Sequence, residues 1–365
     1  MNRLARRILA AAAALVAATA VNAQSWPNKT IKIIVPYPPG GTSDILARSL
    51  GPKITEALGQ SVIVENKPGA TGNIGADFVA KSPGDGYTLL LADIGSLAIA
   101  PSVVPTLAFD PVKDFAPVIM VAYSPHILAA HPSVAAKDAK ELVALAKAKP
   151  DSLNFAVSGI GGANHLAGID FAMRTGIKWT YVPYKGGSQA IADVMGGQAQ
   201  VLFNGMLATY PAVKDGKLKA LAISSAKRFA AAPDIPTVAE SAGLAGFETG
   251  SFQGIVAPAS TPADVVNKLH ATITKILATP EMKDRLDKVP ALIDLGKKSN
   301  NIIRGNLLFA GGVIGLLALI SFTWDLIFPE QRNWALPIAV VGHEGSTVVV
   351  IMNGLRLLGY RPPHV

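Results

Sequence analysis

Short apolar segments alternate with amphipathic segments over the central part of the chain. Runs of apolar or β-branched residues, each bounded by Gly, Pro, Asn or Asp, predict strands at residues 31–35, 61–64, 88–91, 116–121, 154–156, 179–183, 201–203 and 219–223. Between them, helical periodicity predicts helices at residues 43–58, 74–81, 139–148, 163–175, 188–195 and 263–278. This alternation favours an α/β fold with mostly parallel sheets and helices on both faces.

Two strand-to-helix connections share one pattern. Residues 33–44 and 154–165 each run from an apolar strand into a glycine-rich loop and then into polar residues that can cap a helix. Glycine lets the backbone approach a ligand closely, and a helix N-terminus offers unpaired N–H groups to an anion. Ligands of open α/β sheets also bind at the carboxyl ends of strands. The pair of loops therefore predicts a cleft that closes from both sides on a small anion.

The N-terminus has the features of an export signal. Arg3, Arg6 and Arg7 precede an uncharged apolar run at residues 8–20, and residues 21–23 offer small side chains where a signal peptidase reads them. We therefore predict a signal peptide over residues 1–23. The alternative is a short membrane anchor, although the apolar run is shorter than the roughly 20 residues of a spanning helix.

The C-terminal part is apolar in a different way. Residues 305–324 carry no charge and are long enough to span a bilayer, and a second apolar stretch, residues 334–358, is interrupted by His343 and Glu344. Trp324 lies at the edge of the break, where aromatic belts usually lie. We expect a transmembrane α-helical hairpin over residues 305–358, with a buried hairpin of a soluble core as the alternative.

Composition narrows the chemistry further. The 365 residues suit several domains, and 50% apolar against 16% charged residues excludes a disordered chain. The chain has no cysteine, which excludes disulfides, zinc–thiolate sites, iron–sulfur clusters and thiol nucleophiles. The net charge of +8 includes the leader arginines, and both signs are interspersed over residues 24–288 without a basic stripe. A nucleic-acid partner is therefore not expected.

Motifs for common cofactor and catalytic sites are absent. The sequence contains neither the phosphate-binding G-x-x-x-x-G-K-[ST] pattern nor G-x-S-x-G, and residues 159–162 do not complete a dinucleotide fingerprint. No histidine of residues 24–288 lies four positions from another, so we expect neither a metal site there nor a cofactor. One enzymatic alternative stays open, an exported hydrolase with Ser158 as nucleophile, His165 as base and Asp44 as its orienting group.

Six segments of the chain carry a recognisable pattern, at residues 37–44, 64–75, 84–90, 109–118, 182–187 and 232–237. In this order they resemble the extracytoplasmic substrate-binding receptors of tripartite tricarboxylate transporters, the Bug-type receptors, and the resemblance covers about residues 1–288. It implies a non-enzymatic, type II-like periplasmic binding protein whose two α/β lobes close on a small carboxylate. Such a receptor delivers its ligand to the membrane components of a tripartite transporter.

The resemblance also implies a domain plan and a binding site. Lobe 1 would hold residues 24–122, lobe 2 residues 123–225, and residues 226–288 would return to lobe 1 without the family's closing helices. Backbone N–H groups and small hydroxyls of the two loops would hold the carboxylate, partly through water. The implied ligand-binding residues are Tyr37, Gly40, Gly41, Thr42, Ser43, Asp44, Ser158, Gly161, Gly162, Asn164, His165, Tyr184 and Asn204. Simple helix capping is the alternative role of Thr42, Ser43 and Asn164.

Residues 289–365 resemble the last two transmembrane helices of heavy-metal-transporting P-type ATPases, through residues 290–295, 302–308, 343–347 and 353–357. We expect a linker at 289–304, the hairpin at 305–358 and a tail at 359–365. The phosphorylation motif of these pumps is missing, so His343 and Glu344 are only vestigial metal-site candidates. The export signal and the cationic residues beside the hairpin favour opposite orientations, which indicates a fusion of two unrelated pieces. We expect a periplasmic protein, with a receptor tethered to the inner membrane through the hairpin as a further interpretation.

Overall fold

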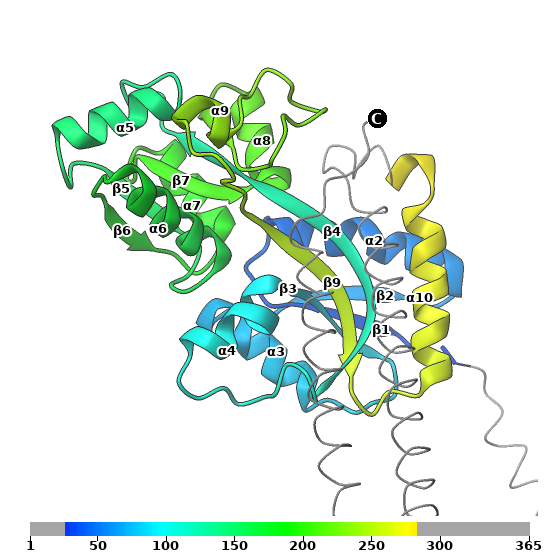
Figure 1. The fold of residues 1–365 in the computed structure, drawn as a ribbon. Coiled ribbons are helices and arrows are strands. Elements are labelled where there is room, and N and C mark those ends of the chain that lie inside the picture. Colours follow the sequence, from blue (N-terminus) through cyan, green and yellow to red (C-terminus); the bar gives the residue numbers. More distant parts are fainter. Residues whose placement is uncertain (1–25, 283–365) are drawn as a thin grey trace, which may run out of the picture. The chain divides into compact units, whose positions relative to one another are not determined.

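The computed structural model describes residues 26–282 as two α/β lobes joined by two long strands (Figure 1). In lobe 1 the sheet runs in the order β2-β1-β3-β9-β4. Its strands are β1 (Ile31–Val35), β2 (Val62–Asn66), β3 (Thr88–Asp93), β9 (Gly250–Pro258) and the first part of β4 (Phe115–Ala130). Its α-helices are α2 (Thr42–Leu58), α3 (Asn73–Ala80), α4 (Ala100–Val103) and α10 (Ala263–Leu277).

Lobe 2 continues the same path with β4-β7-β5-β6, and β8 pairs with β4 on the other side. Its own strands are β5 (Asn154–Val157), β6 (Thr180–Pro183), β7 (Val201–Gly205) and β8 (Lys219–Ile223). Its helices are α5 (Ala139–Ala148), α6 (Ala163–Thr175), α7 (Gly187–Met195), α8 (Met206–Lys214) and α9 (Val238–Ala242).

The strands β4 and β9 carry the chain between the lobes. β4 pairs with β9 as far as Pro125 opposite Gly250, and from His126 onward it pairs with β7. The crossings therefore lie at 125/126 and 249/250, later in the chain than the predicted boundaries at 122/123 and 225/226. Residues 226–249 pack in lobe 2, because Phe229 and Phe247 lie in its two hydrophobic cores.

The prediction of mostly parallel sheets is correct for the outer strands and wrong for the crossing strands. β1 is parallel to β2 and β3, and β5 is parallel to β6 and β7. β9 is antiparallel to both of its neighbours, and β4 is antiparallel to β7, β8 and β9. A strand that connects two lobes must run from one into the other, so a returning strand beside it is necessarily antiparallel.

The two lobes repeat one arrangement around their central strands. β1 lies between β2 and β3, and β5 lies between β6 and β7. Each central strand leads into a glycine-rich loop and then into a helix, α2 or α6. Because the carboxyl ends of parallel strands meet at one edge of a sheet, both loops come to the edges where ligands of α/β proteins bind.

Membrane insertion was predicted for a part of the chain that the structure does not describe. None of the helices within residues 26–282 is both long and apolar enough to cross a bilayer. The predicted signal peptide, linker, hairpin and tail, with His343 and Glu344, lie outside the described residues.

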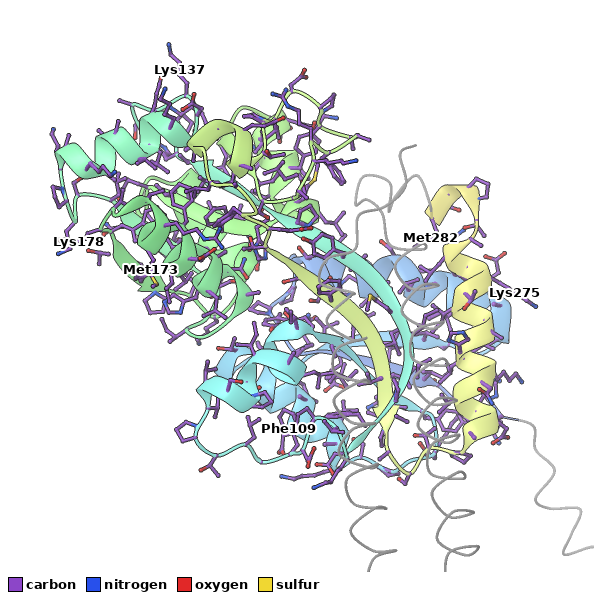
Figure 2. The ribbon with its side chains drawn as sticks, viewed as in Figure 1. Phe109, Lys137, Met173, Lys178, Lys275 and Met282 are labelled. Atoms are coloured by element: carbon purple, nitrogen blue, oxygen red, sulfur yellow. The ribbon has the colours of Figure 1, made fainter. Side chains whose placement is uncertain are left out.

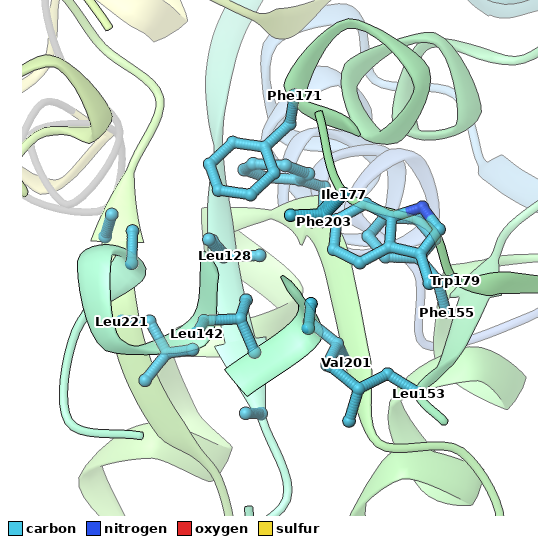
Figure 3. Close-up of a cluster of buried hydrophobic side chains, with 14 of the residues drawn as sticks. Leu128, Leu142, Leu153, Phe155, Phe171, Ile177, Trp179, Val201, Phe203 and Leu221 are labelled. Carbon is cyan, nitrogen blue, oxygen red and sulfur yellow. The ribbon is translucent and has the colours of Figure 1, made fainter. Parts of the chain in front are cut away.

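Lobe 2 is held together by a cluster of aromatic rings (Figure 3). Trp179 stacks on Phe155 with ring centroids 4.4 Å apart and on Phe171 at 5.8 Å. Phe203 lies within 6.2 Å of Phe155 and 5.7 Å of Phe171. These side chains come from β5, β7, α6 and the start of the β6 segment, so the cluster fixes α6 and its N-terminal loop on the sheet.

Truncating the centre of this cluster is expected to destabilise the protein strongly. Phe171 is fully buried, and Phe171→Ala should lower the free energy of unfolding by about 3–5 kcal/mol through lost burial and the cavity left behind. Met173 on the same helix is 77% exposed (Figure 2), so Met173→Ala should change it by less than about 0.5 kcal/mol. Denaturant titration of the full chain measures both, and similar effects of the two variants would contradict this account.

Candidate ligand-binding cleft

A cleft between the lobes is lined by residues of both. From lobe 1 and the crossing strand β9 come Tyr37, Gly41, Thr42, Ser43, Thr71, Asp93, Ser251 and Gln253. From lobe 2 come Ser158, Gly162, Ala163, Asn164, Gly187, Asn204 and Gly205. The two loops that the sequence pairs therefore face one shared cavity.

The two glycine-rich loops end in the same backbone conformation. Gly40 and Gly161 have φ angles of 80° and 77°, a left-handed region that favours glycine. The next glycines, Gly41 and Gly162, have φ/ψ of −80°/169° and −79°/169° and begin α2 and α6. The repeat in the sequence is thus a repeat in three dimensions, with one loop at each wall of the cleft.

In both loops a side chain of the following helix accepts a hydrogen bond from the first of the two glycines. The Gly40 N–H donates to Asp44 Oδ2 at 2.9 Å, and the Gly161 N–H donates to His165 Nδ1 at 3.1 Å. Asp44 and His165 occupy the same position of their loops, four residues after the glycine. Neither these acceptors nor the two glycines line the cleft. They shape the loops, while the following glycine and helix residues face the cavity.

Asp44 is the centre of a buried polar network. Burial alone would raise the pKa of its carboxyl, but hydrogen bonds from Arg48, Gly40 and Asn66 hold that pKa below its ordinary value. The Asn66 amide also donates to the Tyr37 carbonyl oxygen at 2.9 Å. Asp44 therefore stays ionised and keeps both ends of the first loop in place, whereas burial lowers the pKa of His165 and favours its neutral form.

Four helices begin at the cleft with glycine as their N-cap. These caps are Gly41 of α2, Gly162 of α6, Gly186 of α7 and Gly205 of α8, and none provides a side-chain hydrogen bond to the first turn. Residues Thr42, Ser43, Ala163, Asn164 and Gly187 of their first turns line the cavity. No Lys, Arg or His is among the lining residues of the described chain. Backbone N–H groups and helix N-termini are therefore the features of positive character among the lining residues.

A tyrosine–aspartate pair lies beside these helix ends. The Tyr37 hydroxyl donates to Asp93 Oδ1 at 2.8 Å. Burial raises the pKa of Asp93 to about 6, although the hydrogen bonds from Tyr37, Ser96 and Gly95 favour its ionised form. Burial and the neighbouring Asp93 raise the pKa of Tyr37 well above its usual value, so Tyr37 remains a donor.

Asn164 is oriented by its lobe before any ligand arrives. Its Nδ2 lies 3.0 Å from both the Phe203 carbonyl oxygen and Asn204 Oδ1, and Asn204 in turn donates to Thr209. These bonds use the N–H groups of the Asn164 side chain and fix its orientation at the wall of the cleft.

The structure brings most of the predicted site residues together. Those that line the cleft are Tyr37, Gly41, Thr42, Ser43, Ser158, Gly162, Asn164 and Asn204. Those that do not are Gly40, Asp44, Gly161, His165 and Tyr184. Tyr184 packs against a hydrophobic core of lobe 2 instead of the far wall of the cleft.

Sequence reasoning missed Thr71, Asp93, Ala163, Gly187, Gly205, Ser251 and Gln253. Asp93 ends β3, so a polar residue after a predicted buried strand was the available signal for it. Ser251 and Gln253 lie on β9, a strand that was not predicted. Thr71 has a positive φ of 55° that no sequence pattern indicates.

The lobes touch each other around the cleft. The Thr71 hydroxyl of lobe 1 donates to the Ile160 carbonyl oxygen of lobe 2 at 3.0 Å. A Cβ atom on Gly186 would lie 2.5 Å from Pro38 Cδ, and one on Gly205 would lie 2.5 Å from Thr42 Oγ1. Glycines at these positions therefore allow the lobes to approach, and the structure represents a closed arrangement.

The described residues contain neither the hydrogen-bonded pair of a serine hydrolase nor a metal site. Within residues 26–282 no hydrogen bond joins Ser158 to a histidine, and His165 Nδ1 is occupied by the Gly161 N–H. The same residues contain no group of three His, Asp or Glu side chains that could hold a metal ion.

Gly186→Ala is expected to prevent full closure without damaging either lobe. The φ of Gly186 is 178°, which alanine adopts readily, whereas its Cβ would meet the rigid ring of Pro38 across the cleft. Because the chain has no cysteine, spin labels can be placed at Val112→Cys and Met173→Cys, which are 84% and 77% exposed in the native chain. The label distances measured by pulsed electron spin resonance should become longer in Gly186→Ala.

The matched control is Gly196→Ala at the other end of α7, where a Cβ would have no neighbour closer than 3.5 Å. This variant should keep the distances of the parent chain. Identical distances in the Gly186→Ala chain would show that Pro38 and Gly186 do not limit the approach of the lobes.

The chain matches a known protein family and several of its relatives. Residues 46–296 match the model of the tripartite tricarboxylate transporter family receptor. The UPF0065 protein of the tcbD–tcbE intergenic region of Pseudomonas sp. strain P51 is 34% identical over 332 residues, which cover 90% of this chain and 92% of the relative.

Solved structures agree over the described lobes. The R. palustris protein Rpa4515 with adipate is 34% identical, with a TM-score of 0.71, over 72% of this chain and 88% of that chain. The periplasmic binding protein BugD is 35% identical, with a TM-score of 0.69, over 72% and 87%. MatC from Rhodopseudomonas palustris with bound malate is 32% identical, with a TM-score of 0.68, over 72% and 89%. The predicted two-lobed periplasmic-binding-protein fold is confirmed.

A separate, partial match concerns another class of protein. Eighty residues, 22% of this chain, are 42% identical to 11% of a protein named "Probable cobalt/nickel-exporting P-type ATPase" of Mycolicibacterium smegmatis. This match is short relative to the pump.

Proposed function

The chain belongs to the tripartite tricarboxylate transporter receptor family, and on that basis we propose that it is a periplasmic receptor for a small carboxylate. It would capture the solute between its lobes and present it to the membrane components of a tripartite transporter. Similar proteins with adipate and with malate support this class of ligand. Members of this family are substrate-binding receptors, so the prediction of a non-enzymatic protein is confirmed.

The observation that carries the proposal is the convergence of glycine-capped helix starts on one cleft. The carboxylate oxygens would accept N–H groups of the first turns of α2 and α6, which no side chain satisfies. The hydroxyls of Thr42, Ser43 and Ser158 line the same cavity and can donate to the same oxygens. Closure of the lobes would remove water around these contacts and strengthen them.

Calorimetric titration of the full chain with succinate, malate and adipate tests this function. At least one of these acids should bind, and mass spectrometry of the mixture should show no product. Ser158→Asp places a second negative charge in the cavity, so it should weaken binding at least about a hundredfold. Ser152→Asp, on the exposed surface of the same lobe, should leave the affinity unchanged.

Turnover of a bound ester that disappears in Ser158→Ala would instead support the hydrolase alternative. Unchanged affinity in Ser158→Asp would place the ligand outside this cleft.

For the C-terminal part, we propose that residues 289–365 derive from the last two helices of a metal pump and insert as a membrane hairpin over residues 305–358. The uncharged residues 305–324 and the apolar residues 334–358 support insertion. The partial identity to a P-type ATPase supports the origin. A cation pathway needs ligands from several helices, so the proposed role is an anchor for the receptor.

Carbonate extraction of membranes tests the anchor. The full chain should stay in the membrane pellet, because a spanning hairpin resists extraction at high pH. Leu316→Lys combined with Leu319→Lys places two charges in the first predicted helix, each costing about 3 kcal/mol at the membrane centre, and should release the chain. Release of the unmodified chain would show that the hairpin does not insert.

A further inference from the structure

Two acceptor side chains face the cleft from neighbouring strands. Asp93 at the end of β3 pairs directly with Gln253 of the antiparallel β9, and both residues line the cavity. Side chains of such cross-strand partners are close enough to contact one group together. Gln253 is only 3% exposed, so its contacts must come from the protein or from a bound ligand.

Both side chains have an oxygen that the protein does not use. The hydrogen bonds to Asp93 within residues 26–282 all reach Oδ1, from Tyr37 at 2.8 Å, Gly95 at 2.9 Å and Ser96 at 3.3 Å. Oδ2 accepts none of them. The Oε1 atom of Gln253 is buried and has no partner. A buried acceptor without a donor is costly, so this pair is complementary to a group that donates hydrogen bonds.

The charge of Asp93 is also uncompensated. No Lys, Arg or His lines the described cleft, and the loops at its opposite walls offer N–H groups that suit a carboxylate. Burial raises the pKa of Asp93 to about 6, which is consistent with a carboxylate that has no cation beside it and is still mostly ionised at neutral pH. A second anionic group of a ligand would be repelled here. A ligand hydroxyl would donate to one of the two acceptor oxygens and would leave the negative charge of Asp93 unbalanced.

We propose that Asp93 and Gln253 form a subsite for an ammonium group, so that the solute is an amino carboxylate with its carboxylate at the glycine loops. The inference rests on the proposed receptor function and narrows its class of solute. Asp93 would balance the charge of the ammonium, and Gln253 Oε1 would accept a second of its N–H groups.

Calorimetric titration of the full chain with two matched series of acids tests the subsite. L-Aspartate, L-malate and succinate differ in one ammonium, hydroxyl or hydrogen, and L-alanine, L-lactate and propionate differ in the same way. In at least one series the amino acid should bind about tenfold or more tightly than both of its counterparts, as expected for charge-assisted hydrogen bonds.

Asp93→Asn should reduce this preference to less than about threefold, because the asparagine oxygen can keep the bonds from Tyr37, Gly95 and Ser96 while the charge is lost. Gln253→Met, similar in shape, should reduce the preference by a smaller factor. The matched control is Asp138→Asn, which alters another aspartate whose side chain accepts a backbone N–H, at the start of α5 in lobe 2. Asp138→Asn should leave every affinity unchanged.

The outcomes separate the subsite from the receptor function. If in neither series the amino acid binds more tightly than both of its counterparts, while at least one of the carboxylic acids tested binds, the subsite is refuted and the carboxylate receptor stands. The same holds if Asp93→Asn keeps the full preference of the parent chain. If no acid of either series binds, nor adipate, the receptor function fails and the subsite fails with it.

Discussion

Four helices begin at the cleft with glycine as their N-cap, which leaves N–H groups of their first turns without a hydrogen bond from a capping side chain. The function of the fold depends on these N–H groups. A serine, threonine, aspartate or asparagine cap would accept an N–H of the first turn, and replacing such a cap by alanine costs about 1 kcal/mol. At Gly41, Gly162, Gly186 and Gly205 no side chain supplies that bond, so water or a ligand must. A ligand that accepts these N–H groups binds the closed lobes more tightly than the open ones and stabilises closure through its binding free energy.

The N-termini of α2 and α6 can bind a ligand only if the loops before them keep their conformation without it. The protein achieves this with Asp44 in one lobe and His165 in the other, each accepting the N–H of a glycine with positive φ. The pKa of each residue is lowered, which keeps Asp44 charged beside Arg48 and keeps the buried His165 neutral. Both are therefore hydrogen-bond acceptors at neutral pH, which explains why different side chains occupy equivalent positions.

The sequence was informative where structure depends on neighbouring residues and uninformative where it depends on distant ones. The loops at residues 37–44 and 158–165 could be found because glycine and capping residues act over a few positions. β9 was missed because its residues alternate poorly and its position follows from pairing with β3 and β4, far apart in the chain. Ser251 and Gln253 were missed with it. The boundary at residue 226 was placed too early, because Phe247 joins the aromatic core of lobe 2 through contacts with Phe171 and Phe203, which lie far from it in the chain.

Backbone N–H groups recognise a carboxylate but do not distinguish one carboxylic acid from another, because every such ligand presents the same two oxygens. Selectivity in this cleft must therefore come from the side chains around the rest of the ligand, which here are Asp93, Thr71, Asn204, Ser251 and Gln253. All of these residues lie outside the two loops, on β3, β7 and β9 and on the segment before α3. A change in this wall, with the loops and their helices kept, would therefore alter which carboxylic acid the cleft prefers.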